Sequence, residues 1–280
     1  MPGDLNIDYS TFGQISDQAD SLVIEISDQH FVFCEFHSEQ NKPLFITHYP
    51  FNDILSKTVN ESLLYAVNHF RFSEKTYKHV YVNYFEKQFT LCPATFYNEE
   101  NNRTLLEFNA GKIGDKLIIT DDVNSDIKLI YAIDENLKSV LDRLFSHHQL
   151  KHTVTILSRM LLQSEELAKE DILISVHATY IEIVVKKGPQ LMLANQFAVK
   201  TDEDVLYYVL FILEQYQFNP LTVNVTMAGN LHSNSGLIVS LKKYIKTIHL
   251  ALGHKSIDWS GLTGAPQHFN YTLLNRLFCE

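Results

Sequence analysis

Hydrophobic residues form three short runs near the start of the chain. They span residues 22–26, 31–36 and 44–49, and polar turns at residues 27–30 and 41–43 separate them. Apolar or alternating runs of this length, bounded by turn residues, are typical of β-strands. The pattern therefore predicts a three-stranded meander at the beginning of the first half.

The same arrangement recurs in the second half of the chain. It begins at Asp171, 150 residues after Ser21, with an apolar run over residues 172–176, a polar break at residues 177–180 and a second run over residues 181–185. A third run follows after a Lys-Gly-Pro turn. A repeat of this period is too long for a solenoid and indicates two related domains.

After each meander the apolar period changes from that of a strand to that of a helix. Residues 53–70 carry one apolar stripe in the first copy, and the residues after Thr201 carry one in the second. Thr201 precedes three acidic residues, which is typical of a helix N-cap with an acidic first turn. A fourth strand follows each helix, over residues 79–84 and 222–227. Strands that alternate with helices predict mixed sheets flanked by helices.

The two copies differ after the fourth strand. The first copy contains an insertion at about residues 88–127, then a helix that Asp134 can cap, and then a β-branched run at residues 153–157 that predicts a strand. The glycine-rich fragment at residues 110–116 has the wrong spacing for a phosphate-binding loop and predicts a hairpin turn. The second copy ends more directly.

These patterns predict an α/β protein of two duplicated lobes, each a mixed five-stranded sheet flanked by helices. An N-terminal arm occupies residues 1–20, the first lobe residues 21–168 and the second lobe residues 169–280. The arm is polar and irregular, and we expect it to dock on the body or to stay mobile.

Composition and charge narrow the range of functions. The chain has 280 residues, 45% of them hydrophobic and 20% charged, which excludes disorder, collagen and coiled coil. Its net charge of −10 repels phosphate and argues against nucleic acid as a partner. Cys34, Cys92 and Cys279 lie far apart, so no disulfide framework is encoded and we predict a cytoplasmic location. No apolar stretch reaches the roughly 18 residues that a membrane helix needs, so we predict no membrane insertion.

A tandem of two such units resembles the actin-like ATPase superfamily, whose halves share a ribonuclease H-like core and close on a nucleotide. The resemblance covers nearly the whole chain from Ser21. More narrowly, the chain is similar to an uncharacterised bacterial family assigned that fold and to actin-like scaffold proteins of pilus and secretion machines. The resemblance implies a site for ATP with magnesium between the lobes.

The resemblance also locates the phosphate-binding motifs, which read apolar-Asp-apolar-Gly in the superfamily. The carboxylate orients metal-bound water, and the glycine lets backbone N–H groups approach the phosphates. Glu25 and Ser27 occupy these positions in the first copy, and Ser175 and His177 occupy them in the second. The first copy therefore keeps an acid but loses the glycine, and the second copy loses both.

A third motif of the superfamily places a Gly-Gly pair against the adenosine. This chain has Gly229 followed by Asn230, a partial match that also suits an ordinary turn from strand to helix. These six degenerate motif positions, Glu25 to Asn230, are the candidate nucleotide-binding residues that the resemblance implies.

Other candidate sites have simpler explanations. His147, His148 and His152 form the densest histidine cluster, but no carboxylate or cysteine completes a metal-ligand set, and imidazoles near helix-terminal carbonyls are commoner. The acids at residues 202–204 suit a helix N-terminus better than catalysis. The chain has no G-x-S-x-G elbow and no H-E-x-x-H motif.

The sequence therefore favours a protein-interaction or assembly module of actin-like fold, with an unknown protein partner, no cofactor and no catalytic residue. The alternative is an ATP-binding protein or weak ATPase, in which Glu25 places the metal and Gly229 faces the base. A ribonuclease H-like nuclease is a third hypothesis, which the net charge disfavours because it repels the substrate.

Overall fold

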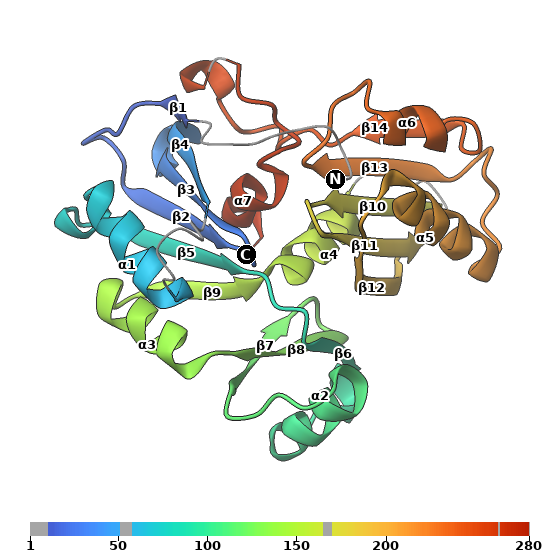
Figure 1. The fold of residues 1–280 in the computed structure, drawn as a ribbon, viewed down its shortest axis with the longest axis horizontal. Coiled ribbons are helices and arrows are strands. Elements are labelled where there is room, and N and C mark those ends of the chain that lie inside the picture. The colour runs from blue at the N-terminus through green and yellow to red at the C-terminus, as the bar shows by residue number, and fades with distance from the viewer. Residues whose placement is uncertain (1–10, 51–57, 165–169, 263, 280) are drawn as a thin grey trace.

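The computed structural model describes residues 11–50, 58–164, 170–262 and 264–279. Two mixed sheets form the centres of two lobes, and a smaller antiparallel sheet lies beside the first lobe (Figure 1). Helices flank both mixed sheets. The predicted α/β architecture of two duplicated lobes is confirmed.

The sheet of the first lobe has the strand order β1-β4-β3-β2-β5-β9. Strands β1 to β4 pair antiparallel, whereas β5 pairs parallel with both β2 and β9. The sheet has six strands because a strand from the predicted arm, β1, pairs with β4. The strands are β1 (Thr11–Gly13), β2 (Ser21–Ile26), β3 (His30–His37), β4 (Lys42–Pro50), β5 (His79–Tyr84) and β9 (His148–His152).

The sheet of the second lobe has five strands in the order β12-β11-β10-β13-β14. Its central strand β10 pairs antiparallel with β11 and parallel with β13, as β2 pairs with β3 and β5. The matching order of strands shows the duplication that the sequence predicts. The strands are β10 (Glu170–Val176), β11 (Tyr180–Lys187), β12 (Gln190–Ala198), β13 (Asn224–Gly229) and β14 (Thr247–Leu250).

The insertion in the first lobe forms a three-stranded antiparallel sheet in the order β6-β8-β7, with a helix, α2 (Asn102–Ala110), packed against it. Its strands are β6 (Phe89–Pro93), β7 (Leu117–Asp122) and β8 (Ile127–Ile133). The hairpin turn predicted at residues 110–116 is wrong, since Gly111 and Gly114 connect α2 to β7. Both have positive φ angles, of 80° and 62°, and a turn of this kind favours glycine whichever elements it joins.

Side-chain caps define where the main helices begin. Thr201 caps α5 (Asp202–Gln215) in a capping box with Asp204, and Asp134 accepts a hydrogen bond of 2.9 Å from the backbone of Leu137 at the start of α3, so both predicted caps are confirmed. Thr58 caps α1, and the predicted helix residues 53–57 lie outside the described residues. The remaining bounds are α1 (Val59–His69), α3 (Glu135–Leu144), α4 (Thr153–Gln163), α6 (Gly236–Leu241) and α7 (Tyr271–Asn275).

The strand predicted at residues 153–157 is wrong, because these residues begin helix α4. The side chain of His152 accepts a hydrogen bond of 3.1 Å from the backbone of Val154 and caps the helix. All five residues are buried, since α4 packs against β10, β11 and β12 of the second lobe as well as against α7. The predicted run covers only five residues, fewer than two helical turns, so it does not distinguish the period of a helix from that of a strand.

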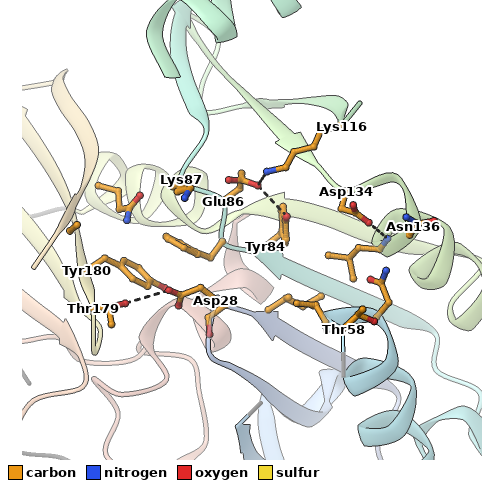
Figure 2. Close-up of a pocket in the computed structure, with 18 residues that line it drawn as sticks. Asp28, Thr58, Tyr84, Glu86, Lys87, Lys116, Asp134, Asn136, Thr179 and Tyr180 are labelled. Atoms are coloured by element: carbon orange, nitrogen blue, oxygen red, sulfur yellow. Dashed lines mark hydrogen bonds and ion pairs between the residues drawn. The ribbon is translucent and has the colours of Figure 1, made fainter. Parts of the chain in front are cut away.

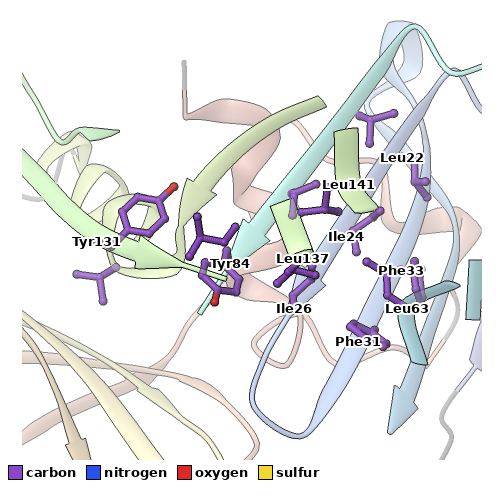
Figure 3. Close-up of a cluster of buried hydrophobic side chains, with 14 of the residues drawn as sticks. Leu22, Ile24, Ile26, Phe31, Phe33, Leu63, Tyr84, Tyr131, Leu137 and Leu141 are labelled. Atoms are coloured by element: carbon purple, nitrogen blue, oxygen red, sulfur yellow. The ribbon is translucent and has the colours of Figure 1, made fainter. Parts of the chain in front are cut away.

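Side chains that alternate along β2 build two separate cores on the two faces of the first sheet. Leu22, Ile24 and Ile26 pack with residues of α1 and α3 such as Leu63 and Leu141 (Figure 3). Val23 and its neighbours on the opposite face pack against four buried residues from the C-terminal end of the chain, Ile257, Leu262, Leu273 and Leu274. The C-terminal segment therefore crosses from the second lobe and covers one face of the first sheet.

Candidate functional site

The turn after β2, at the first predicted phosphate loop, is closed by its own hydrogen bonds. The hydroxyl oxygen of Ser27 accepts from the backbone N–H groups of Gln29 and His30, at 3.2 and 3.0 Å. The backbone N–H of Ser27 donates to the carbonyl of His30 at 3.0 Å. Backbone N–H groups bind a phosphate only when they are free to point at it. Three such groups are already occupied within this turn.

The side chain of His30 adds no positive charge to the turn. The pKa of His30 is lowered to about 3, mainly by burial and also by the nearby His48 and His177. A ring with this pKa is neutral at pH 7. It therefore offers no electrostatic attraction for a phosphate.

Glu25, the predicted metal-placing acid, lies beneath the turn on the face of the first sheet that α7 covers. It alternates with Ile26, so its side chain shares the face of Val23 and Asn83. The pKa of Glu25 is raised to about 7, chiefly by burial; His177 and a hydrogen bond with Asn83 oppose this rise, and Glu182 adds to it. Its Oε2 atom has no hydrogen-bond partner among the described residues. A carboxyl group in this setting is protonated below pH 7.

In the second lobe, His177 is held by side chains of its own strands. Its Nε2 atom lies 3.0 Å from the Ser175 hydroxyl and 3.1 Å from the Glu182 carboxylate. Serine, histidine and an acid are the groups of a hydrolase triad, but a triad needs the serine and the acid on different ring nitrogens. Here both contact Nε2, so the ring cannot pass a proton from one to the other. Glu182 also accepts a hydrogen bond from the Thr153 hydroxyl.

Aromatic rings fill the space between the two turns. The ring of Tyr180 stacks on His177 with 4.2 Å between centroids, and on Phe85, from the end of β5, with 3.9 Å. Tyr180 is 3% exposed. Beside the stack, the hydroxyl of Thr179 donates to the Asp28 carboxylate across the lobes, at 3.3 Å (Figure 2). The two predicted phosphate loops therefore contact each other through side chains.

Gly229 and Asn230 lie where β13 meets β10. The φ angle of Gly229 is +86°, and a Cβ atom on it would lie 2.2 Å from the carbonyl oxygen of Val176. Its N–H donates to the carbonyl of His268 at 2.7 Å, and the N–H of Asn230 donates to that of Val176 at 2.7 Å. Glycine is required here because two backbones approach closely. The N–H of Gly229 therefore already donates to the C-terminal segment and is not free for a ligand.

The described residues contain no cluster of histidine, cysteine, aspartate or glutamate side chains able to hold a metal ion. The histidines at positions 148 and 152 lie on strand β9 rather than on a helix, and His152 is fully buried as the cap of α4. The structure thus places Glu25 close enough to His177 for an electrostatic interaction, with His177 in contact with Ser175, and leaves Gly229 and Asn230 at the end of β13.

A pocket of about 740 Å³ opens on the other face of the first sheet (Figure 2). The first turn, the starts of α1 and α3 and the end of β5 line it from the first lobe, and Thr179, Tyr180, Gln196 and Ala198 line it from the second. Ile26, Val59 and Leu137 supply apolar surface. The volume lies within the usual range of ligand pockets.

Charged residues from the insertion and from the segment after β5 form one side of this pocket. Lys116 of the insertion makes an ion pair of 2.7 Å with Glu86, and Lys87 lies beside it (Figure 2). Sequence reasoning identified Asp134 only as a helix cap and did not find the pocket, because its walls come from seven separate segments of the chain. Thr58 and Asp134, which cap two helices, belong to two of these walls. Their helix-start patterns are the only sequence signal that points toward the pocket.

The two lobes, their strand order and the turns that face each other define an actin-like ATPase fold. A Bacteroides thetaiotaomicron protein with an actin-like ATPase fold and unknown function superposes with a TM-score of 0.80 at 21% identity, over 96% of this chain and 100% of that chain. A PilM-PilN type IV pilus biogenesis complex superposes with a TM-score of 0.62 at 13% sequence identity, over 94% of this chain and 97% of that chain. The ethanolamine utilization protein EutJ from Carboxydothermus hydrogenoformans superposes with a TM-score of 0.52 at 8% sequence identity, over 100% of this chain and 93% of that chain. The predicted resemblance to this fold and to pilus scaffolds is confirmed.

The chain belongs to the family described as protein of unknown function (DUF3822), whose model matches residues 9–248. Comparison with curated proteins gives no match. Within the ranges that the structure describes, no helix has the length and apolar character needed to span a bilayer.

Proposed function

We propose that this chain is a protein-interaction module that does not hydrolyse nucleotide, and that a segment of a protein partner binds in the 740 Å³ pocket. The observation that carries the proposal is the closed first turn. The Ser27 hydroxyl occupies the N–H groups of Gln29 and His30, which a phosphate would need. Binding a triphosphate would require breaking these bonds and removing the buried Ser27 side chain from the turn.

The second turn supports the same conclusion. The stack of His177, Tyr180 and Phe85 occupies the space between the lobes where the fold would place phosphates. Separating these rings would expose the large apolar surfaces that they bury against each other. Burial raises the pKa of the Glu25 carboxyl group to about 7, so below that pH the group carries no charge with which to attract a metal ion.

A protein partner is supported by the fold comparison and by the pocket itself. One of the similar structures is a complex, that of PilM with PilN, so a protein of this fold serves type IV pilus biogenesis through a protein partner. The pocket of this chain combines an apolar floor with a polar rim. Recognition pockets for side chains of a protein partner have this composition.

The nucleotide-free part of the proposal is tested by isothermal titration calorimetry with ATP and magnesium. We expect no binding tighter than a Kd of about 100 μM, which corresponds to about −5.5 kcal/mol. The heat of diluting ATP into buffer is the control. Tighter binding would overturn the proposal, as would phosphate release from ATP that disappears in the Glu25→Gln variant.

A further inference from the structure

Strand β12 ends the second sheet and leaves one edge open. It is nine residues long and pairs with β11, and no other strand in the described part of the chain pairs with it. Its sequence, QLMLANQFA, has no charged residue and no proline. Edge strands usually carry such residues because they prevent pairing with other chains. A register shift beside Val185 disturbs the beginning of the strand, and the part from Leu193 onward is regular.

The register shows which backbone groups face the open edge. The N–H of Val199 donates to the carbonyl of Thr179, just beyond the end of β11, at 2.9 Å. Backbone direction alternates along a strand, so Phe197 and Asn195 also face β11, and the residues between them face outward. The outward residues are Ala194, Gln196 and Ala198.

One side-chain contact agrees with this alternation. The N–H of Gln196 does not donate to β11 but to the side chain of its exposed neighbour Asn195, at 2.8 Å. An exposed asparagine contact costs little to exchange for a carbonyl of another strand. The outward N–H of Gln196 is therefore available to an added strand.

The open edge continues into the pocket. Gln196 and Ala198, which face outward, are also residues of the pocket lining. An extended chain that pairs beside Ala194 and Gln196 would reach the pocket within two or three residues. The apolar floor at Ile26, Val59 and Leu137 would then receive one of its side chains.

We infer that the outer edge of β12 and the pocket form one binding site, which holds an extended segment of the protein partner as an added β-strand. The inference deepens the proposed function and rests on it. Main-chain hydrogen bonds to β12 supply part of the affinity, and one apolar side chain in the pocket supplies specificity. The net charge of −10 favours lysine or arginine on either side of the paired residues.

A second copy of this chain fits the site less well. A symmetric antiparallel pair of β12 strands centred on Ala194 would place Gln190 of the second copy opposite Ala198, at the pocket. The tight turn at Gly188, with a φ angle of +56°, would then lie at the pocket mouth, and no chain would enter. Two copies with a net charge of −10 each also repel one another.

The test is a selection of peptides of about 10 residues from a random display library on the full chain. The affinity of the selected peptides is then measured on two variants. Gln196→Pro removes the outward N–H and leaves the pairing with β11 intact, whereas Gln196→Ala removes the same side chain and keeps the N–H. Because Gln196→Ala removes the same pocket side chain, we expect the affinity of Gln196→Pro to be at least about tenfold lower than that of Gln196→Ala. Thermal unfolding checks that both variants fold.

A second measurement does not depend on the variants. Each selected peptide is made with N-methyl groups on its odd or on its even residues, and only one of the two sets should lose binding, because alternate N–H groups face β12. If the selected peptides bind the pocket but keep their affinity with either set of N-methyl groups and on the Gln196→Pro variant, the strand inference is overturned and the proposed function stands. A selection without binders would contradict both. A dimer in sedimentation that Gln196→Pro abolishes would assign the edge to a second copy and overturn the inference.

Discussion

Replacing Gly229 with alanine is expected to lower the free energy of unfolding by about 4 kcal/mol. Its φ angle of +86° is one that residues with a side chain rarely adopt, and the new Cβ atom would lie 2.2 Å from the carbonyl oxygen of Val176. Because β10 and β13 are adjacent paired strands at the centre of the second lobe, neither strand can move away without breaking the backbone hydrogen bonds between them. Urea unfolding followed by circular dichroism measures the effect.

Gly188→Ala is the matched control for this substitution. Gly188 also has a positive φ angle, of +56°, but nothing lies within 4 Å of a Cβ atom placed on it. The backbone penalty alone is about 1 kcal/mol. If the two variants lose equal stability, the close approach of Gly229 to Val176 does not explain why glycine stands there.

Replacing Glu25 with glutamine is expected to stabilise the protein at pH 8 by about 3 kcal/mol, and by much less at pH 5. Burial raises the pKa of Glu25 from 4.5 to about 7. Between these values the unfolded chain has lost the proton and the folded chain has kept it. The wild type therefore loses stability as the pH rises from about 4.5 to 7, and the loss is complete above pH 7. Glutamine has no proton to lose, so its variant avoids this loss.

Glutamine also suits the contacts at this position. The Oδ1 atom of Asn83 has no hydrogen-bond donor among the described residues, and the amide of the new side chain can donate to it. Unfolding in urea at pH 5 and pH 8 measures the difference. Glu99→Gln, at an exposed position, is the control and should change little at either pH. A Glu25→Gln variant less stable than the wild type at pH 8 would show that the ionised carboxylate is satisfied in the folded protein.

The fold was predictable where local patterns carry the information. The turns at Ser27 and His177 separate strands of clear period, and the 150-residue spacing from Ser21 to Asp171 places both in equivalent lobes. Period and caps also located helices α3 and α5, which begin directly after the capping residues. Helix α4 was missed because the apolar run at its start, residues 153–157, is too short to distinguish a helical period from that of a strand.

The candidate site was less predictable because its properties depend on contacts between distant segments. The sequence shows that Ser27 replaces a glycine, but not that its hydroxyl occupies two backbone N–H groups. The stack of Tyr180 on Phe85 joins residues that belong to different lobes. The open edge of β12 follows from the strand order, which no single strand encodes. The nucleotide-binding roles assigned to the six motif positions stay predictions.

The C-terminal segment that covers the first sheet has a consequence for how the chain unfolds. Leu273 and Leu274 lie against Val23 and Ile46 in one buried cluster, although more than 200 residues separate them along the chain. Cutting between the lobes would uncover this apolar surface on both fragments. Neither half is then a self-sufficient folding unit, and the intact chain should melt in a single cooperative step rather than lobe by lobe.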